Sequence, residues 1–206
     1  MYKPRVFREE DPARLTDLIE RHSFGTLIVA APTGELDIAH VPVLFDRDVD
    51  GQARLRLHVA AANSIWRAAV AAGRATVVFS GPHGYVSANW YERPTEQVPT
   101  WNYAVAHAHG TPHVLERDDL LRLLDDLVAA NESAGPAAWS TSRLSPALRD
   151  ELLLQIVGLS ITVTTLEGKF KLSQNRSETD RLRVVDAFRL RAGNDDLELV
   201  DLMTKR

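Results

Sequence analysis

The run from Arg54 to Val59 alternates strictly between polar and apolar side chains, and this period of two is the feature that most constrains the fold. Its apolar residues fall at positions 55, 57 and 59, and two arginines and His58 occupy the positions between them. A strand with one face of each kind needs partner strands and an apolar core on one side only. We therefore expect an antiparallel sheet in which His58 leaves the core-facing row.

Other segments extend this pattern along the chain. The turn residues Pro32-Thr33-Gly34 separate two β-rich runs, which predicts a hairpin, and successive antiparallel strands of this kind favour a barrel. Helices are expected where proline or a polar cap precedes an apolar stripe, as at Asp11-Pro12 and Ser177. The expected strands are 26–30, 38–45, 54–59, 75–79 (ending at Gly81-Pro82), the run around Trp101 and 156–166, and the expected helices are 12–21, 64–72, 117–132, 146–154, 177–190 and one near the C-terminus. The predicted fold class is α+β, mainly antiparallel β, in a single domain, 1–206, with a C-terminal helical extension from about 177.

Composition excludes several classes of function. The net charge of −4 gives no global positive field to attract nucleic acid, and the absence of cysteine excludes thiol nucleophiles, disulfides and thiolate metal ligands. No stretch approaches the roughly 20 apolar residues of a membrane span. We expect a cytoplasmic protein without a membrane partner.

The segment from Val98 to Gly110 carries the most binding chemistry. On a strand, Trp101 and Tyr103 share one side and Asn102 takes the other. An indole or phenol ring packs against a flat cofactor ring, and the Asn102 amide can read a polar ring edge. The alternative for Trp101 is a tryptophan that anchors the core.

Two further groups of polar side chains follow strand spacing. His83, Tyr85 and Ser87 fall on one face, which is either a site wall or an ordinary solvated face. His107 and His109 form an H-x-H pair, but the sequence offers no suitable third ligand nearby, since His113 lies close in sequence but beyond Pro112. We expect this pair to hydrogen-bond to a neighbouring segment, and we expect no metal site.

The stretch from Lys169 to Arg176 is the one most suited to phosphate. Lys171 and Arg176 supply positive charge, and side-chain donors lie between them, just before the helix that Ser177 opens. The alternative is a solvated loop. Nucleotide loops of the G-x-G-x-x-G or Walker type are absent, as are G-x-S-x-G and H-E-x-x-H, so no catalytic residue is assigned.

The sequence resembles the PaiB family of FMN-binding negative transcriptional regulators. The resemblance runs along nearly the whole chain and is carried by the following segments: Tyr2 with Phe7-Arg8-Glu9 and Pro12, Phe24 with Thr26-Leu27, His40 with Pro42, His58 with Asn63 and Trp66, Gly81 to Tyr91, Val98 to Gly110, and Leu166 to Arg176.

This resemblance implies an FMN-binding split β-barrel with peripheral helices, a homodimer with the flavin between its subunits, and negative transcriptional regulation. The cofactor contacts that it implies are His58, Asn63, Tyr85, Ser87, Trp101, Asn102, Lys171, Gln174, Asn175 and Arg176. The chain departs from the family pattern at Ala61 and Ser64, where relatives often carry Arg and Pro, and the change at Ala61 removes one expected phosphate contact.

Two alternatives stay open. The related piperazate synthases are similar in outline but use haem, which would make this chain a haem b enzyme with His58 as the iron ligand. A flavin-dependent reductase would share the same fold. Because no helix-turn-helix pattern is evident, we expect any DNA association to be weak or indirect.

Overall fold

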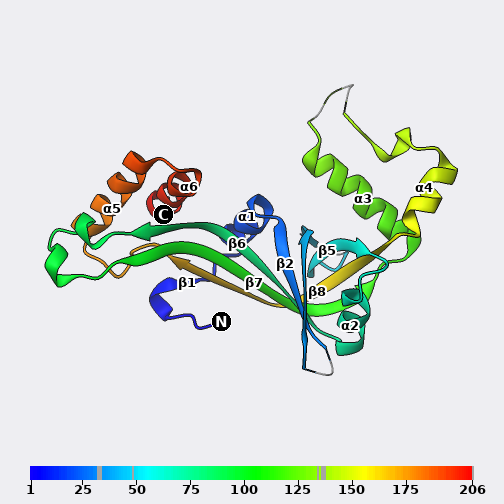
Figure 1. Ribbon diagram of the computed structural model, residues 1–206, viewed down its shortest axis with the longest axis horizontal. Coiled ribbons are helices and arrows are strands. Elements are labelled where there is room, and N and C mark those ends of the chain that lie inside the picture. The colour runs from blue at the N-terminus through cyan, green and yellow to red at the C-terminus, as the bar shows by residue number, and fades with distance from the viewer. Residues whose placement is uncertain (32–33, 48, 134, 136–137, 206) are drawn as a thin grey trace. The chain divides into compact units, whose positions relative to one another are not determined.

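The computed structural model describes residues 1–31, 34–47, 49–133, 135 and 138–205 (Figure 1). Contacts divide the chain into two compact units. Unit 1 comprises Met1–His22, Phe79–His107 and Glu167–Arg206, and unit 2 comprises Ser23–Val78 and Ala108–Leu166. The turn predicted at Pro32-Thr33 lies outside the described residues. The single-domain organisation stays a prediction.

The expected mainly antiparallel α+β fold is confirmed. The α-helices are α1 (Pro12–Arg21), α2 (Ile65–Ala72), α3 (Arg117–Asn131), α4 (Pro146–Leu153), α5 (Glu178–Arg191) and α6 (Asn194–Thr204). The strands are β1 (Arg8–Glu9), β2 (Phe24–Ala30), β3 (Leu36–Pro42), β4 (Leu44–Arg47), β5 (Ala53–Ala60), β6 (Ala75–Val86), β7 (Thr100–Val114) and β8 (Ile156–Lys171). Short 3₁₀ turns cover η1 (Arg5–Phe7), η2 (Ala88–Trp90), η3 (Pro94–Glu96) and η4 (Thr141–Arg143).

The strands form one sheet in the order β3-β2-β6-β7-β8-β5-β4, with β1 paired to β8. The sheet is not closed, because within the described residues β3 and β4 stand at the two ends of this order. The predicted hairpin is confirmed, since β2 and β3 pair antiparallel from Phe24 opposite Pro42 to Ala30 opposite Leu36. No helix among the described residues is long and apolar enough to cross a membrane.

The alternation along β5 folds as expected in unit 2. Leu55 and Leu57 are fully buried, and Val59 is nearly so. On the opposite row, Asp46 of β4 accepts hydrogen bonds from Arg54 and from Arg56, at 2.5 and 2.6 Å. The two arginines of the polar row are thus held by one carboxylate on the neighbouring strand.

The prediction of one strand over 38–45 is wrong, because the chain makes two strands there. Val43 interrupts the run: its side chain is buried and its N–H donates to the Ser23 carbonyl at 2.9 Å. Before this point β3 pairs with β2, and after it β4 pairs with β5. The change of partner strand ends the first strand, although the hydrophobicity of the sequence continues through it.

The prediction that a strand ends at Gly81-Pro82 is also wrong, since β6 continues to Val86. Proline cannot donate to a strand ladder. However, the registered pairing of β6 with β2 covers only residues 76–78, so Pro82 lies beyond it. Gly81 permits close packing, because a Cβ there would lie 3.0 Å from the Ala104 carbonyl. Strand β8 is likewise longer than expected and reaches Lys171.

Unit 1 packs its helices around the halves of β6, β7 and β8 that belong to it. The Asp11 side chain caps α1 by accepting from the Ala13 N–H at 2.9 Å, and Leu15, Leu18 and Ile19 form the expected buried stripe. The predicted helix after Ser177 is confirmed as α5, with the Ser177 hydroxyl accepting from a backbone N–H in its first turn. Its Val184, Val185 and Phe188 are buried.

Candidate functional site

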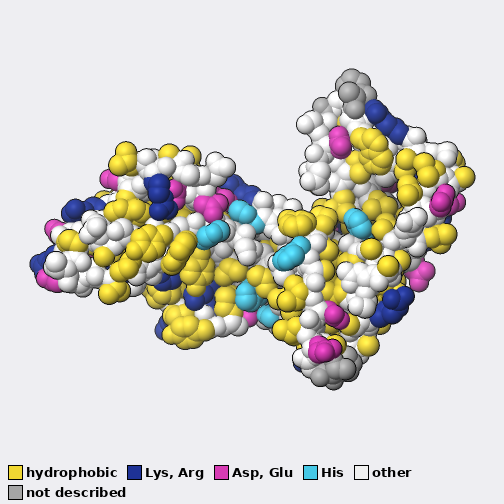
Figure 2. Space-filling model, in the orientation of Figure 1, with side chains coloured by type: hydrophobic (Ala, Val, Ile, Leu, Met, Phe, Trp, Pro, Cys, Tyr) yellow, Lys and Arg dark blue, Asp and Glu magenta, His cyan; other side chains and the backbone are white. Residues whose placement is uncertain are grey.

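An exposed aromatic face lies on β6 and β7 of unit 1. Trp101 is 51% exposed and Tyr85 is 40% exposed, and their rings meet edge to face with centroids 5.9 Å apart. The centroid of the His83 ring also lies close, 6.2 Å from that of the Trp101 ring. In Figure 2, hydrophobic side chains with histidines beside them gather over this part of unit 1. The tryptophan thus offers a ring surface to solvent and does not anchor the core.

A cluster of cations borders this face at the end of β8. The Lys171 ammonium donates to the Thr100 hydroxyl at 2.6 Å and to the Trp101 carbonyl at 2.5 Å, both neutral acceptors. Burial lowers the pKa of Lys171, and the positive charges of Arg176 and Lys169 lower it further. A lysine whose pKa is lowered by neighbouring cations favours an anion placed among them.

Some polar side chains of the loop after β8 hydrogen-bond within the protein, and others are exposed at the surface. The Gln174 amide turns back into the loop, where it accepts from the Leu172 N–H and donates to the Phe170 carbonyl, each at 2.6 Å. Arg176 donates to the Gln97 side chain and stacks over the Tyr91 ring at 4.6 Å. Asn175 is exposed.

Asn102 occupies the opposite face of β7 from Trp101 and is fully buried. Its amide nitrogen donates to the Ser173 hydroxyl at 3.0 Å, and that hydroxyl lies 3.1 Å from the amide oxygen. Ser173 is buried and has a φ of 63°, a left-handed conformation that few residues other than glycine adopt. The buried pair therefore fastens the cation-bearing loop to the strand that displays Trp101.

Helices α5 and α6 support the other side of the aromatic face. Arg191 donates to the Tyr85 carbonyl at 3.2 Å and to the buried carboxylate of Asp196 at 2.7 Å. The hydrogen bond from Arg191 holds the pKa of Asp196 below its ordinary value, although burial acts in the opposite direction. Ser87 lies just past β6, where its hydroxyl caps η2 by accepting from the Asn89 N–H at 3.2 Å.

The two remaining predicted contacts, His58 and Asn63, belong to unit 2. Asn63 is exposed, and its side chain accepts from the Ile65 N–H at 3.0 Å at the start of α2. His58 lines a cavity of about 760 Å³, and its Nδ1 is buried without a hydrogen-bond partner. Burial lowers the pKa of His58, so the ring is neutral at pH 7.

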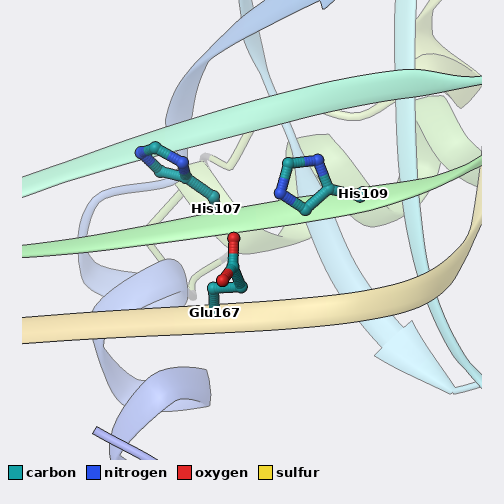
Figure 3. A group of neighbouring side chains, drawn as sticks. All are labelled: His107, His109 and Glu167. Carbon is teal, nitrogen blue, oxygen red and sulfur yellow. The ribbon is translucent and has the colours of Figure 1, made fainter. Parts of the chain in front are cut away.

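The two histidines of the H-x-H pair lie on the same face of β7, and Figure 3 shows them with Glu167 of β8. In unit 1, Glu167 already pairs with the Met1 amino group at 3.2 Å and with Lys3 at 3.3 Å. In unit 2, His109 Nδ1 lies 2.9 Å from the Thr76 hydroxyl. Because Glu167 and His109 have partners within their own units, we assign no metal to this group.

Sequence reasoning missed the residues of the large cavity in unit 2. Arg149 of α4 lines it and has a buried Nε without a partner, and Trp139 lines it as well. The sequence of α3 did contain a signal, because the helix has more leucines than a single buried stripe needs. Two of them, Leu121 and Leu124, are only half-buried and line the cavity.

Comparison with known proteins places the chain in a family. A family model described as "Putative FMN-binding domain" matches residues 1–165. The chain belongs to this family. A Bacillus subtilis (strain 168) relative named Protease synthase and sporulation protein PAI 2 is 34% identical over 205 residues, which span 98% of this chain and 96% of the relative. The resemblance to PaiB is thus confirmed, and the protein is a PaiB-like member of an FMN-binding family.

Solved structures support the split-barrel fold. A FAD and haem binding protein from Mycobacterium smegmatis matches with a TM-score of 0.60 at 22% identity, over 80% of this chain and 73% of that one. A flavocytochrome from Azotobacter vinelandii matches with a TM-score of 0.62 at 14% identity, over 88% and 78% of the two chains. At these identities the likeness concerns the fold alone.

The Asn102–Ser173 pair yields a prediction about stability. Replacing Asn102 with alanine leaves the buried Ser173 hydroxyl unpaired, and the expected loss of unfolding free energy is about 1–3 kcal/mol. Urea denaturation measures it. The matched control is Asn175→Ala, which removes an exposed amide and should change the midpoint little. Equal midpoints for the two variants would show that the pair does not hold the loop.

Proposed function

We propose that this protein binds FMN on the aromatic and cationic face of unit 1 and acts as a PaiB-like negative transcriptional regulator. The observation that carries the proposal is the juxtaposition of the exposed Trp101 ring with the Lys171 ammonium, which is bonded to the carbonyl of that same tryptophan. A flat ring surface beside a cationic group suits a planar cofactor that ends in a phosphate.

The residues of this face fit a flavin in distinct ways. Trp101 and Tyr85 would contact the ring system, while Lys171 and Arg176 would hold the phosphate. Asn102 and Gln174, whose amides are engaged within the protein, would act by fixing the loop and not by touching the cofactor. When bound, the flavin supplies a planar redox-active ring, and the chain supplies its position and the charge around its phosphate.

Regulation is the second part of the proposal, and it rests on membership of the PaiB-like family. The net charge of −4 argues against strong nonspecific attraction to DNA, so we propose that any contact with DNA is weak or passes through a partner. A flavin-dependent reductase would share the same face and would differ in having a substrate pocket above the flavin. Its turnover of a reduced nicotinamide would be measured by the loss of the nicotinamide's near-ultraviolet absorbance.

The proposed flavin site predicts that FMN affinity can be lowered in two ways, through ring contact or through phosphate charge. Trp101→Ala removes ring contact worth about 0.5–1.5 kcal/mol beyond area burial, so FMN affinity should fall on the order of tenfold. Lys171→Ala removes a charged donor and should also cost about tenfold, with an effect that shrinks as salt rises. Quenching of FMN fluorescence measures both affinities.

Riboflavin, which lacks the phosphate, separates the two routes. It should lose affinity in Trp101→Ala and keep it in Lys171→Ala. The matched controls are Trp139→Ala in unit 2 and Lys205→Ala, an exposed lysine paired with Asp201, and neither should change FMN binding. A Lys171 variant that weakens riboflavin and FMN equally would remove the phosphate role.

We also propose a homodimer, which the outer edge of unit 2 supports. Strand β3 ends the described sheet order and turns Leu36 and Ile38 outward, with Ile38 57% exposed. On the neighbouring strand, Phe24 is also exposed and stacks on His40 at 6.5 Å. An exposed edge with an apolar row is a surface that soluble proteins cover.

Sedimentation tests the dimer. The wild-type protein at micromolar concentration should sediment as a dimer, and Ile38→Glu should shift it toward monomer because each interface then buries two charges. The control is Val49→Glu, which places the same charge at a fully exposed residue outside β3 and should leave the dimer intact. A wild-type monomer would refute the proposal.

Haem is the second candidate cofactor, and one observation favours it. The buried Nδ1 of His58 has no hydrogen-bond partner and its ring lines a largely apolar cavity. A neutral imidazole in such surroundings can ligate iron. Because the ring is kept neutral by burial, it needs no deprotonation before ligation at pH 7.

The absorption spectrum of the protein decides between the cofactors. We expect flavin bands in the purified protein, and in His58→Ala an unchanged band shape with at most a shift in FMN affinity. The control is His113→Ala, which removes an exposed histidine. Stoichiometric haem uptake with a Soret band that disappears in His58→Ala, but not in His113→Ala, would replace FMN by haem b as the cofactor.

A further inference from the structure

The cavity of unit 2 has the dimensions of a small-molecule site. Its volume of about 760 Å³ falls within the roughly 300–1,000 Å³ typical of such sites. Helices α3 and α4 border it, together with Glu132, Trp139, Thr141 and Leu144 between them and with His58. Figure 2 shows hydrophobic side chains gathered over this part of unit 2.

The cavity wall is mainly apolar and is left partly uncovered by the protein itself. Leu120, Leu123, Leu127 and Leu153 form the buried cluster between α3 and α4. Leu121 and Leu124 also line the cavity but are only half-buried. An apolar surface that the fold does not fill is available to the apolar body of a ligand.

Two residues that line this cavity each have a polar atom that is buried without a partner. The atoms are His58 Nδ1 and Arg149 Nε. Buried polar atoms in folded proteins are almost always hydrogen-bonded, so an unpaired atom at a cavity needs an explanation. Both residues line the same cavity, which places an arginine without a hydrogen-bond partner at Nε beside its apolar wall.

Charge decides the class of ligand. Arg149 is always protonated, and no ion pair of its guanidinium is found among the described residues. The carboxylate in the lining, Glu132, accepts instead from the Trp139 N–H at 3.3 Å. A guanidinium without an ion pair binds best to a carboxylate, with which it can form two parallel hydrogen bonds.

We propose that this cavity binds a small apolar carboxylic acid, with the acid group held by Arg149 and the hydrocarbon body packed against Leu121, Leu124 and Trp139. The site is separate from the flavin face of unit 1, and the proposal does not rest on the proposed function. A regulator with such a site would respond to the acid as its ligand.

The experiment is calorimetric titration with three ligands that share a ten-carbon chain: decanoate, decanol and decylamine. Decanoate should bind, decanol about tenfold or more weakly, and decylamine not measurably, because only the acid pairs with the guanidinium. Arg149→Leu should abolish the preference for decanoate over decanol. The control is Arg122→Leu, which removes an exposed arginine of α3 already paired with Asp119.

A second variant keeps the test independent of Arg149. Leu124→Trp adds volume on the wall and should block decanoate and decanol alike, while thermal melting confirms that the variant folds. Titration of FMN alongside separates this site from the flavin site: decanoate should leave FMN affinity unchanged in the wild type, and Leu124→Trp should still bind FMN.

Three outcomes would overturn the proposal. The first is the absence of decanoate binding, and the second is equal affinity for decanoate and decanol in the wild type. The third is displacement of decanoate by FMN or by haem in a manner that needs His58, which would assign the cavity to the cofactor.

Discussion

The alternation of β7 is the constraint on which the site of unit 1 depends. On one face of the strand, Asn102 and the small side chains of Ala104 and Ala106 are buried; on the other, Trp101 and Tyr103 stay accessible. A slip of one residue in register would exchange the two faces and bury the tryptophan. The same alternation therefore buries one row of side chains in the core and exposes the Trp101 ring, and a change of register would alter both.

Local patterns in the sequence predicted the elements and the accessible faces well. The period of two identified the buried row of β5 and placed Trp101 and Asn102 on opposite faces of β7, and proline or serine caps located α1 and α5. What the patterns missed depends on distant partners. Hydrophobicity runs unbroken through Val43, yet the chain changes from one partner strand to another at that residue.

The candidate site shows the same limit. Residue type indicated that Asn102 and Gln174 carry useful amides, but only the fold shows that both amides are engaged in hydrogen bonds within the protein. Sequence alone also gave no reason to single out Arg149, because its importance lies in lacking a partner next to a cavity. Charge and size can be read from a sequence, whereas the satisfaction of hydrogen bonds requires the tertiary structure.

The left-handed Ser173, fastened to Asn102, has a consequence for anyone redesigning the protein. The loop and the strand are joined by one buried pair, so a longer loop or a different residue at position 173 would move the Lys171 and Arg176 charges relative to Trp101. In the proposed FMN site, ring contact and phosphate contact would therefore change together. A redesign for a cofactor with a longer or shorter side chain would need to rebuild the Asn102–Ser173 pair before the charges.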